Sequence, residues 1–137
     1  MNIRQITKVF IILILTCTTL VTCNYQPYAQ GERLYIVHCE NCHAKDGSGL
    51  KKLIPPISHS NFLQDNFNSL SCIIKFGISD TLRVNGVKYT TPMAGIPNLT
   101  AAEIANISNF IIYEFEYNYG YFSEGQVNDQ LSGCNWV

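Results

Sequence analysis

The sequence predicts an all-α fold with one small β-hairpin. Two local patterns and the chain length support this prediction. Thr100-Ala-Ala-Glu103 has the form of a capping box, and the isoleucines that follow it at positions 104, 107 and 111 recur at helical spacing. Asn85-Gly86 separates two short β-prone runs, which is typical of a two-residue hairpin turn. The 137 residues are enough for one ordinary domain and not for two.

Composition narrows the class of protein. The formal net charge is −1, so nothing indicates a nucleic-acid binder. Seven Phe, eight Tyr and one Trp supply enough aromatic surface to argue against a disordered chain. Charged residues make up only 14 %, partly because residues 9–31 contain no charged side chain.

The first 22 residues have the organisation of a secretory signal. Arg4 and Lys8 precede an unbroken apolar run over residues 9–15, and a Thr-rich stretch follows. The alternative is a transmembrane anchor. A helix over residues 9–22 would span only about 21 Å, whereas the hydrocarbon core is roughly 30 Å thick. We therefore expect residues 1–22 to be a signal peptide and the mature chain to be exported.

Cys23 lies where that signal would be cleaved. Leu20-Val-Thr-Cys23 resembles the lipobox of bacterial lipoproteins, whose cysteine is diacylated and becomes the mature N-terminus, although Thr22 replaces the usual small residue. Two acyl chains satisfy the requirement for stable anchoring. Cys17 is a weaker second candidate, and a soluble periplasmic protein with a free Cys23 is the alternative. We expect a lipid anchor at Cys23 on the periplasmic side of a bacterial membrane, with residues 23–30 as a tether.

The mature chain then reads as short helices and loops. Residues 31–38 form a predicted helix, and residues 44–56 form a loop rich in Gly, Lys and Pro. Ser60 is predicted to cap a helix over residues 61–67. Asn68 is predicted to cap another helix that stops at Gly77.

The second half of the mature chain contains the hairpin and the long helix. Residues 82–84 and 87–89 are the two hairpin strands, and the long helix runs from the capping box to about residue 116. Residues 118–137 form an extension that is first aromatic and then polar.

Cys39-Glu-Asn-Cys42-His43 is the c-type haem attachment motif. Two cysteines three residues apart on a helical turn face the same way, so each thiol can add to one vinyl group of haem. His43 is then held beneath the iron as the proximal ligand. A thioredoxin-like redox pair would need a βαβ context, and a zinc site would need four ligands. We predict one covalent haem c, attached through Cys39 and Cys42.

The second axial ligand can be approached by elimination. Met1 leaves with the signal, so Met93 is the only thioether of the mature chain. It lies fifty residues after His43 in a loop rich in Pro and Gly. The alternative ligand is His59, which would give an iron with two histidine ligands. We expect His38 to be a surface residue. We expect Met93 to be the ligand.

Taken together, residues 28–117 resemble a class I monohaem cytochrome c of bacterial type. The resemblance implies N- and C-terminal helices that cross beside the haem, with Gly31 at their close contact and Tyr35 as a packing aromatic. It also implies that the carbonyl of Pro55 supports the ring of His43, although loop stiffening is an alternative role for this proline. The hairpin before the axial Met is similar to that of some bacterial members. The implied domain spans residues 31–117, and the extension after it departs from the family pattern.

Cys72 and Cys134 remain after these assignments. In an oxidising compartment we expect them to form a disulfide that ties the extension to the domain. Two buried free thiols are the alternative.

The predicted function is electron transfer, and the chain is predicted not to be an enzyme, because iron held by His43 and Met93 has no open site for substrate.

Six of the seven mature bases lie between residues 45 and 88, and no base follows Glu103. A weakly basic ring around the haem edge would suit an acidic redox partner, although an ordinary solvated surface is the alternative. The expected partners are a quinol-oxidising complex and a terminal oxidase or reductase. A haem subunit of a larger enzyme, such as a dehydrogenase or nitrite reductase, is the alternative function, and a ligand-binding or peroxidatic haem would require Met93 to leave the iron.

Overall fold

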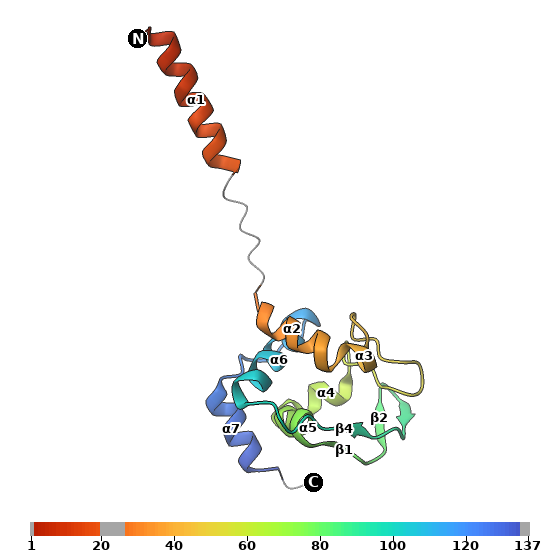
Figure 1. Ribbon diagram of the computed structural model, residues 1–137. Helices are drawn as coiled ribbons and strands as arrows, with labels where there is room; N and C mark the ends of the chain where they lie inside the picture. Colours follow the sequence, from red (N-terminus) through yellow and green to blue (C-terminus); the bar gives the residue numbers. More distant parts are fainter. Residues whose placement is uncertain (1, 20–26, 135–137) are drawn as a thin grey trace.

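Helices form the main architecture, as the sequence predicts (Figure 1). A computed structural model describes residues 2–19 and 27–134. The helical elements are α1 (Ile3–Thr19), α2 (Ala29–His38), α3 (Glu40–His43), α4 (Asn61–Asp65), the 3₁₀ turn η1 (Phe67–Ser69), α5 (Leu70–Phe76), α6 (Ala101–Glu114) and α7 (Glu124–Ser132). Within residues 2–19 and 27–134, no helix combines the length and apolarity needed to span a bilayer. The predicted anchor, Cys23, lies outside the described residues.

Four short strands complete the described part of the fold. They are β1 (Gly77–Ile78), β2 (Leu82–Val84), β3 (Val87–Tyr89) and β4 (Met93–Ala94). The predicted hairpin is confirmed, since β2 and β3 pair antiparallel and Asn85 and Gly86 turn between them with φ of 50° and 80°. Positive φ at both central residues is the signature of a type I′ turn. A second antiparallel ladder pairs Ile78 with Met93 and was not predicted.

Helices α2 and α6 cross in close contact (Figure 1). A Cβ on Gly31 would overlap the backbone carbonyl of Asn106, so only glycine fits there. Tyr35 is 1 % exposed, and its ring centroid lies 5.3 Å from that of Phe110 and 5.9 Å from that of Phe115. The expectations for Gly31 and Tyr35 are therefore confirmed.

The capping box of α6 is also confirmed. The side-chain oxygen of Thr100 accepts a hydrogen bond from the Glu103 amide at 3.3 Å, and the Glu103 carboxylate accepts one from the Thr100 amide at 2.8 Å. The helix ends with a Schellman pattern in which the Tyr117 amide donates to the Ile112 carbonyl at 2.9 Å. Glu116 takes the left-handed position of that pattern, with φ of 54°.

The middle of the chain differs in part from the prediction. Ser60 caps α4 as expected, accepting from the Leu63 amide at 3.1 Å, but α4 stops at Asp65 and a 3₁₀ turn follows. The predicted cap at Asn68 is wrong, because this residue lies inside η1 and its side chain accepts from the Tyr119 hydroxyl at 2.6 Å. Helix α5 stops at Gly77, with φ of 83°, as predicted.

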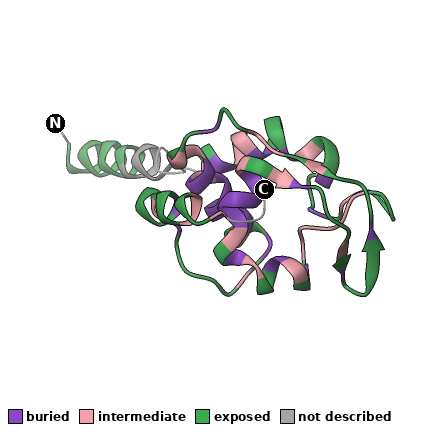
Figure 2. Cartoon of the chain, turned by 90° about the horizontal axis from the view of Figure 1, so that it is seen from below, coloured by how far each residue is buried: buried purple, intermediate pink, exposed green. Residues whose placement is uncertain are grey.

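The extension packs against the core and contains the unpredicted helix α7. Ser123 and Gln126 form a capping box at its start, and Phe122 and Val127 are buried. The Asn109 side chain accepts from the Phe122 amide at 2.8 Å and donates to the Phe122 carbonyl at 2.9 Å. A disulfide joins Cys72 of α5 to Cys134. Figure 2 shows the buried residues gathered where these helices meet.

Candidate cofactor site

An apolar cavity of about 490 Å³ lies between the α2–α3 corner, α5 and the loop that carries Met93. Its volume is in the range of pockets that hold small molecules and cofactors. Its walls are mostly aliphatic. They include Ile54, Ile57, Leu63, Leu70, Ile73, Ile74, Ile78, Leu82, Val84, Ile96 and Ile111. The fold therefore keeps a large apolar space in its interior.

The two motif cysteines stand at the edge of this cavity on one helical turn. The Cys39 carbonyl accepts from the His43 amide at 2.9 Å, and both cysteines line the cavity. Cys39 is buried and Cys42 is exposed, and both are free thiols. Burial, with a smaller contribution from Cys42, raises the pKa of the Cys39 thiol to about 12. Two thiols that face one apolar space are suited to bonding two points of a single flat apolar group.

His43 is held in the state that a metal ligand requires. Its Nδ1 atom lies 3.1 Å from the carbonyl oxygen of Pro55. A carbonyl can only accept, so Nδ1 carries the proton and Nε2 keeps its lone pair. Burial lowers the pKa of the His43 imidazole, which favours its neutral form. This geometry accords with the role of Pro55 that the family resemblance implies.

Besides packing in the core, Tyr35 stabilises the chain next to His43 through a hydrogen bond that the sequence did not reveal. Its hydroxyl donates to the carbonyl of Ala44 at 2.7 Å. Ala44 follows His43 and has φ of 64° and ψ of 163°, a region that residues other than glycine rarely adopt. Burial raises the pKa of the Tyr35 phenol, so the hydroxyl remains a donor at neutral pH. The buried ring thus helps to hold a strained residue beside the candidate ligand.

Met93 lines the same cavity as His43, although it comes from a distant part of the chain. The β1–β4 ladder fixes its backbone by pairing Met93 with Ile78, which also lines the cavity. The rival ligand His59 is exposed, in a turn with φ of 52°, and is not among the lining residues. His38 is exposed and lies at the cavity edge. The structure therefore brings Cys39, Cys42, His43 and Met93 to one cavity and leaves His59 outside it.

Tyr117 holds another part of the cavity wall and was also missed from sequence. Its hydroxyl donates to the Ile57 carbonyl and accepts from the Ser60 amide at 2.8 Å. Both Ile57 and Ser60 line the cavity. The Phe67 ring packs edge-on against the tyrosine ring, with centroids 5.0 Å apart. Tyr117, which follows α6, thus fixes the turn between the His43 loop and α4.

Comparison with known proteins places this site in a family. The cytochrome c family matches residues 28–113, which run from the start of α2 almost to the end of α6. Cytochrome c-552 of Thermus thermophilus is 28 % identical over 87 residues, covering 61 % of this chain and 66 % of that protein. The cytochrome c subunit of the quinone alcohol dehydrogenase of Gluconobacter oxydans is 29 % identical over 83 residues, covering 59 % of this chain and 17 % of that protein. The matched segment thus covers less than two thirds of either relative.

The match and the cavity agree. The matched residues contain both motif cysteines, His43 and Met93, and all four line the cavity. An apolar cavity with two thiols at its edge and a nitrogen ligand inside fits a covalently bound haem. The chain therefore belongs to the cytochrome c family.

Proposed function

We propose that this chain is an exported electron carrier, tethered through Cys23 to the periplasmic side of a bacterial membrane. As a cytochrome c, it carries a covalently attached haem c and acts in haem-based electron transfer. We assign the attachment to Cys39 and Cys42 and the axial positions to His43 and Met93. The observation that carries this assignment is that all four side chains line one apolar cavity, although Met93 is fifty residues from His43. When bound, the haem supplies one-electron exchange between ferric and ferrous iron.

Each assigned residue has a distinct task. His43 offers Nε2 to the iron because its Nδ1 proton is committed to Pro55. Met93 offers a soft thioether, which favours ferrous iron and a high reduction potential. The aliphatic walls exclude water, which also affects the potential. If His43 and Met93 both held the iron, it would have no open site for a substrate, which supports a carrier rather than an enzyme.

Surface charge supports docking to acidic redox proteins. The exposed bases after the motif lie on the loop between His43 and α4 and on the hairpin, and both segments contribute residues to the cavity wall. They are Lys45, Lys51, Lys52, Arg83 and Lys88. Such a field accelerates encounter more than it tightens binding. A quinol-oxidising complex as donor and a terminal oxidase or reductase as acceptor are the partners we propose.

A fixed subunit of a larger enzyme, such as a dehydrogenase or nitrite reductase, is the second candidate. It is favoured by the similarity to the cytochrome c subunit of a quinone alcohol dehydrogenase. Purification from native membranes under mild detergent separates the two candidates. A carrier is expected to elute near its own mass, whereas a subunit would elute with a large complex.

Haem staining after denaturing electrophoresis tests the attachment. The wild-type band is expected to stain near the mass of the mature chain, and the Cys39→Ala/Cys42→Ala variant is expected to lose the stain. A Cys72→Ala/Cys134→Ala variant is the matched control, because it also loses two cysteines yet should keep the stain. A stained band from the Cys39→Ala/Cys42→Ala protein would overturn the assignment.

A further inference from the structure

The segment between Met93 and helix α6 is fastened to the C-terminal end of α5. The β1–β4 ladder pairs Gly77, which directly follows α5, with Ala94 (Figure 1). The Ile96 amide donates to the Ile74 carbonyl at 2.9 Å. These are bonds between backbone groups, which most residue types could form. The end of α5 therefore positions the segment that begins at the candidate axial ligand.

Lys75 adds a side-chain bond to these backbone bonds. It stands in the last turn of α5, and its Nζ atom donates to the Leu99 carbonyl at 2.6 Å. Leu99 is buried and precedes Thr100, the N-cap of α6, so its carbonyl lies outside the hydrogen-bond ladder of that helix. A buried carbonyl needs a donor, and the Lys75 ammonium supplies one. Leu99 is six residues after Met93, so Lys75 fastens the far end of the segment.

The ammonium group of Lys75 lies in a favourable electrostatic environment. A cation is stabilised at the C-terminal end of a helix, which is where Lys75 stands. Hydrogen bonds from Thr100 lower the pKa of the Glu103 carboxyl, and the charge of Lys75 lowers this pKa further by a smaller amount. Lys75 is half-buried, whereas the bases of the His43 loop and of the hairpin are exposed. Lys75 therefore belongs to the packed fold more than to the basic surface.

Gly95 shows how closely the segment approaches α5. A Cβ on Gly95 would overlap the backbone of Phe76 and of Lys75. A residue larger than glycine would therefore push the segment away from the end of α5. Gly95→Ala thus displaces the segment without altering any charge.

We propose that Lys75 is a positioning residue for Met93. By tying Leu99 to α5, it holds the segment in place and keeps the Met93 side chain at the haem cavity. Lys75 itself does not line that cavity, so it acts through the segment. A thioether is a soft ligand and holds ferric iron less firmly than ferrous iron, so this support matters most in the ferric protein. The inference rests on the proposed axial role of Met93.

Imidazole binding to the ferric holoprotein tests the proposal, because imidazole competes with Met93 for the iron. Lys75→Met should raise the imidazole affinity about tenfold, the factor expected for losing a hydrogen bond from a charged group. A titration followed by the haem spectrum gives the affinity. Lys75→Arg should bind imidazole as the parent does, because its guanidinium can donate to the same carbonyl.

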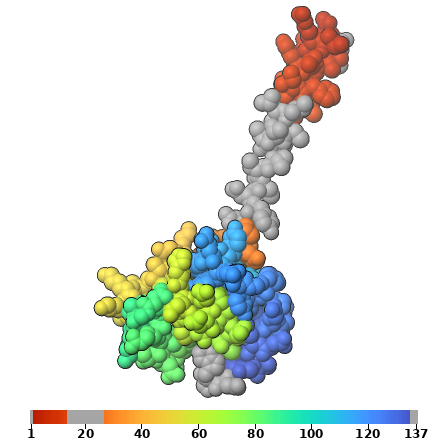
Figure 3. Space-filling model, turned by 180° about the vertical axis from the view of Figure 1, so that it is seen from behind, coloured from red at the N-terminus to blue at the C-terminus, as the bar shows by residue number. Residues whose placement is uncertain are grey.

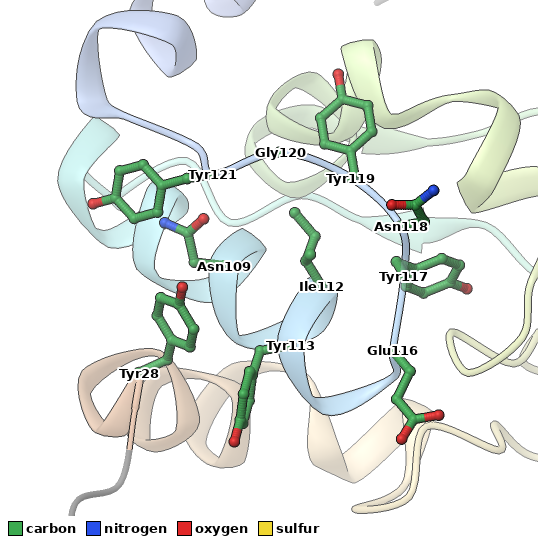
Figure 4. Close-up of a pocket in the computed structure, with 10 residues that line it drawn as sticks. All are labelled: Tyr28, Asn109, Ile112, Tyr113, Glu116, Tyr117, Asn118, Tyr119, Gly120 and Tyr121. Atoms are coloured by element: carbon green, nitrogen blue, oxygen red, sulfur yellow. The ribbon is translucent and has the colours of Figure 1, made fainter.

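Two matched controls isolate the effect of position. Lys88→Met removes the same charge from the exposed hairpin, which Figure 3 shows in green, and should leave the affinity unchanged. Gly95→Ala should raise the affinity as Lys75→Met does. Gly120→Ala is its control on the segment after α6 (Figure 4). Apart from its chain neighbours, no atom of the described residues lies within 4 Å of a Cβ added there, so the affinity should not change.

A double variant separates this proposal from the axial assignment. Lys75→Met/Met93→Ala should bind imidazole as Met93→Ala alone does, because Lys75 acts through Met93. The proposal is overturned if Met93→Ala binds imidazole more tightly than the parent while Lys75→Met lowers only the free energy of unfolding. It is also overturned if Lys88→Met gives the same gain as Lys75→Met. Parent affinity in Met93→Ala would instead refute the axial assignment, and with it this role of Lys75.

Discussion

The Nδ1 atom of His43 lies 3.1 Å from the carbonyl oxygen of Pro55, twelve residues further along the chain. Pro55 is itself followed by Pro56, and a residue before proline is restricted to extended backbone angles. The direction of the accepting carbonyl is therefore limited by the sequence that follows it. Pro55 and Pro56 together thus restrict the direction of the Pro55 carbonyl, which in turn orients the His43 imidazole.

Replacing Met93 tests the second axial ligand. Met1 lies in the predicted signal, so Met93 would be the one methionine left in the mature chain, and no other methionine could take its place. Met93→Ala should open the iron to water or cyanide and lower the reduction potential, while the haem stays covalently attached. Optical spectra of the oxidised protein should lose the weak sulfur-to-iron band near the infrared edge, and a potentiometric titration gives the shift. His59→Ala is the control and should keep the parent spectrum. An unchanged spectrum in the Met93 variant would exclude this ligand.

Cys23 is predicted to carry lipid. The wild-type protein should partition with membranes, because two acyl chains give stable anchoring. Cys23→Ala should release the protein to the soluble periplasmic fraction, whereas Cys17→Ala should not. Mass spectrometry of the mature N-terminal peptide provides the direct measurement. An unmodified peptide that begins at another residue would contradict the anchor.

The disulfide between Cys72 and Cys134 is predicted to stabilise the domain. It closes a loop with a sequence separation of 62 residues, for which the chain-entropy relation gives roughly 4 kcal/mol. Cys72→Ser/Cys134→Ser should therefore lower the free energy of unfolding in a denaturant titration by up to that amount. Alkylation of the denatured, unreduced wild-type protein should leave both cysteines unlabelled. Labelling of both would show that the bond is absent from the mature protein.

Tyr117→Phe is predicted to destabilise the cavity wall. It would leave the Ile57 carbonyl and the Ser60 amide without this partner in a partly buried region, at a cost of about 2 kcal/mol. Denaturant unfolding measures the loss of stability. A shift in reduction potential would show that the cavity wall held by Tyr117 has moved. Tyr119→Phe is the matched control, because its hydroxyl bonds only to the exposed side chain of Asn68 among the contacts described. Equal stabilities of the two variants would refute this role.

Stability in acid should depend on Glu103. Hydrogen bonds from Thr100 lower the pKa of its carboxyl below the ordinary value of 4.5. A lowered pKa in the folded state means that stabilisation is present above pH 4.5 and is lost as the pH falls through the folded-state value. Glu103→Gln keeps a capping-box residue but cannot titrate, so its stability should fall less steeply in acid. Thermal melts between neutral pH and pH 3 compare the two proteins. Parallel curves would contradict the prediction.

Patterns among neighbouring residues predicted much of the fold. They failed where contacts between residues far apart in the sequence determine the local structure. The capping box at Thr100 and the Asn85-Gly86 turn depend on neighbouring residues, and both were confirmed. Helix α7 has a capping box of the same kind at Ser123, but only Val127 and Leu131 mark an apolar side in its sequence. The packing of Phe122 and Val127 against the core stabilises it instead. The cap expected at Asn68 failed because the side chain bonds to Tyr119, fifty-one residues away.

The candidate site could likewise be predicted only where its residues are neighbours in the sequence. Residues 39–43 form a contiguous motif, so their chemistry can be read directly from the sequence. The residues that hold the cavity wall cannot be predicted from a motif. Tyr117 bonds to Ile57, which is sixty residues away in the sequence, and no periodic pattern encodes that contact. The β1–β4 ladder that fixes Met93 has two residues in each strand, which is too short to produce an alternating pattern.

The haem cavity has a consequence for the order of events in biogenesis. Aliphatic side chains line this cavity of about 490 Å³, and they lose close packing when no apolar group fills it. The polypeptide without its prosthetic group should therefore be less stable than the holoprotein, and covalent attachment should complete the packing of the core. The cofactor is then a structural component of the hydrophobic core as well as the redox centre of the protein.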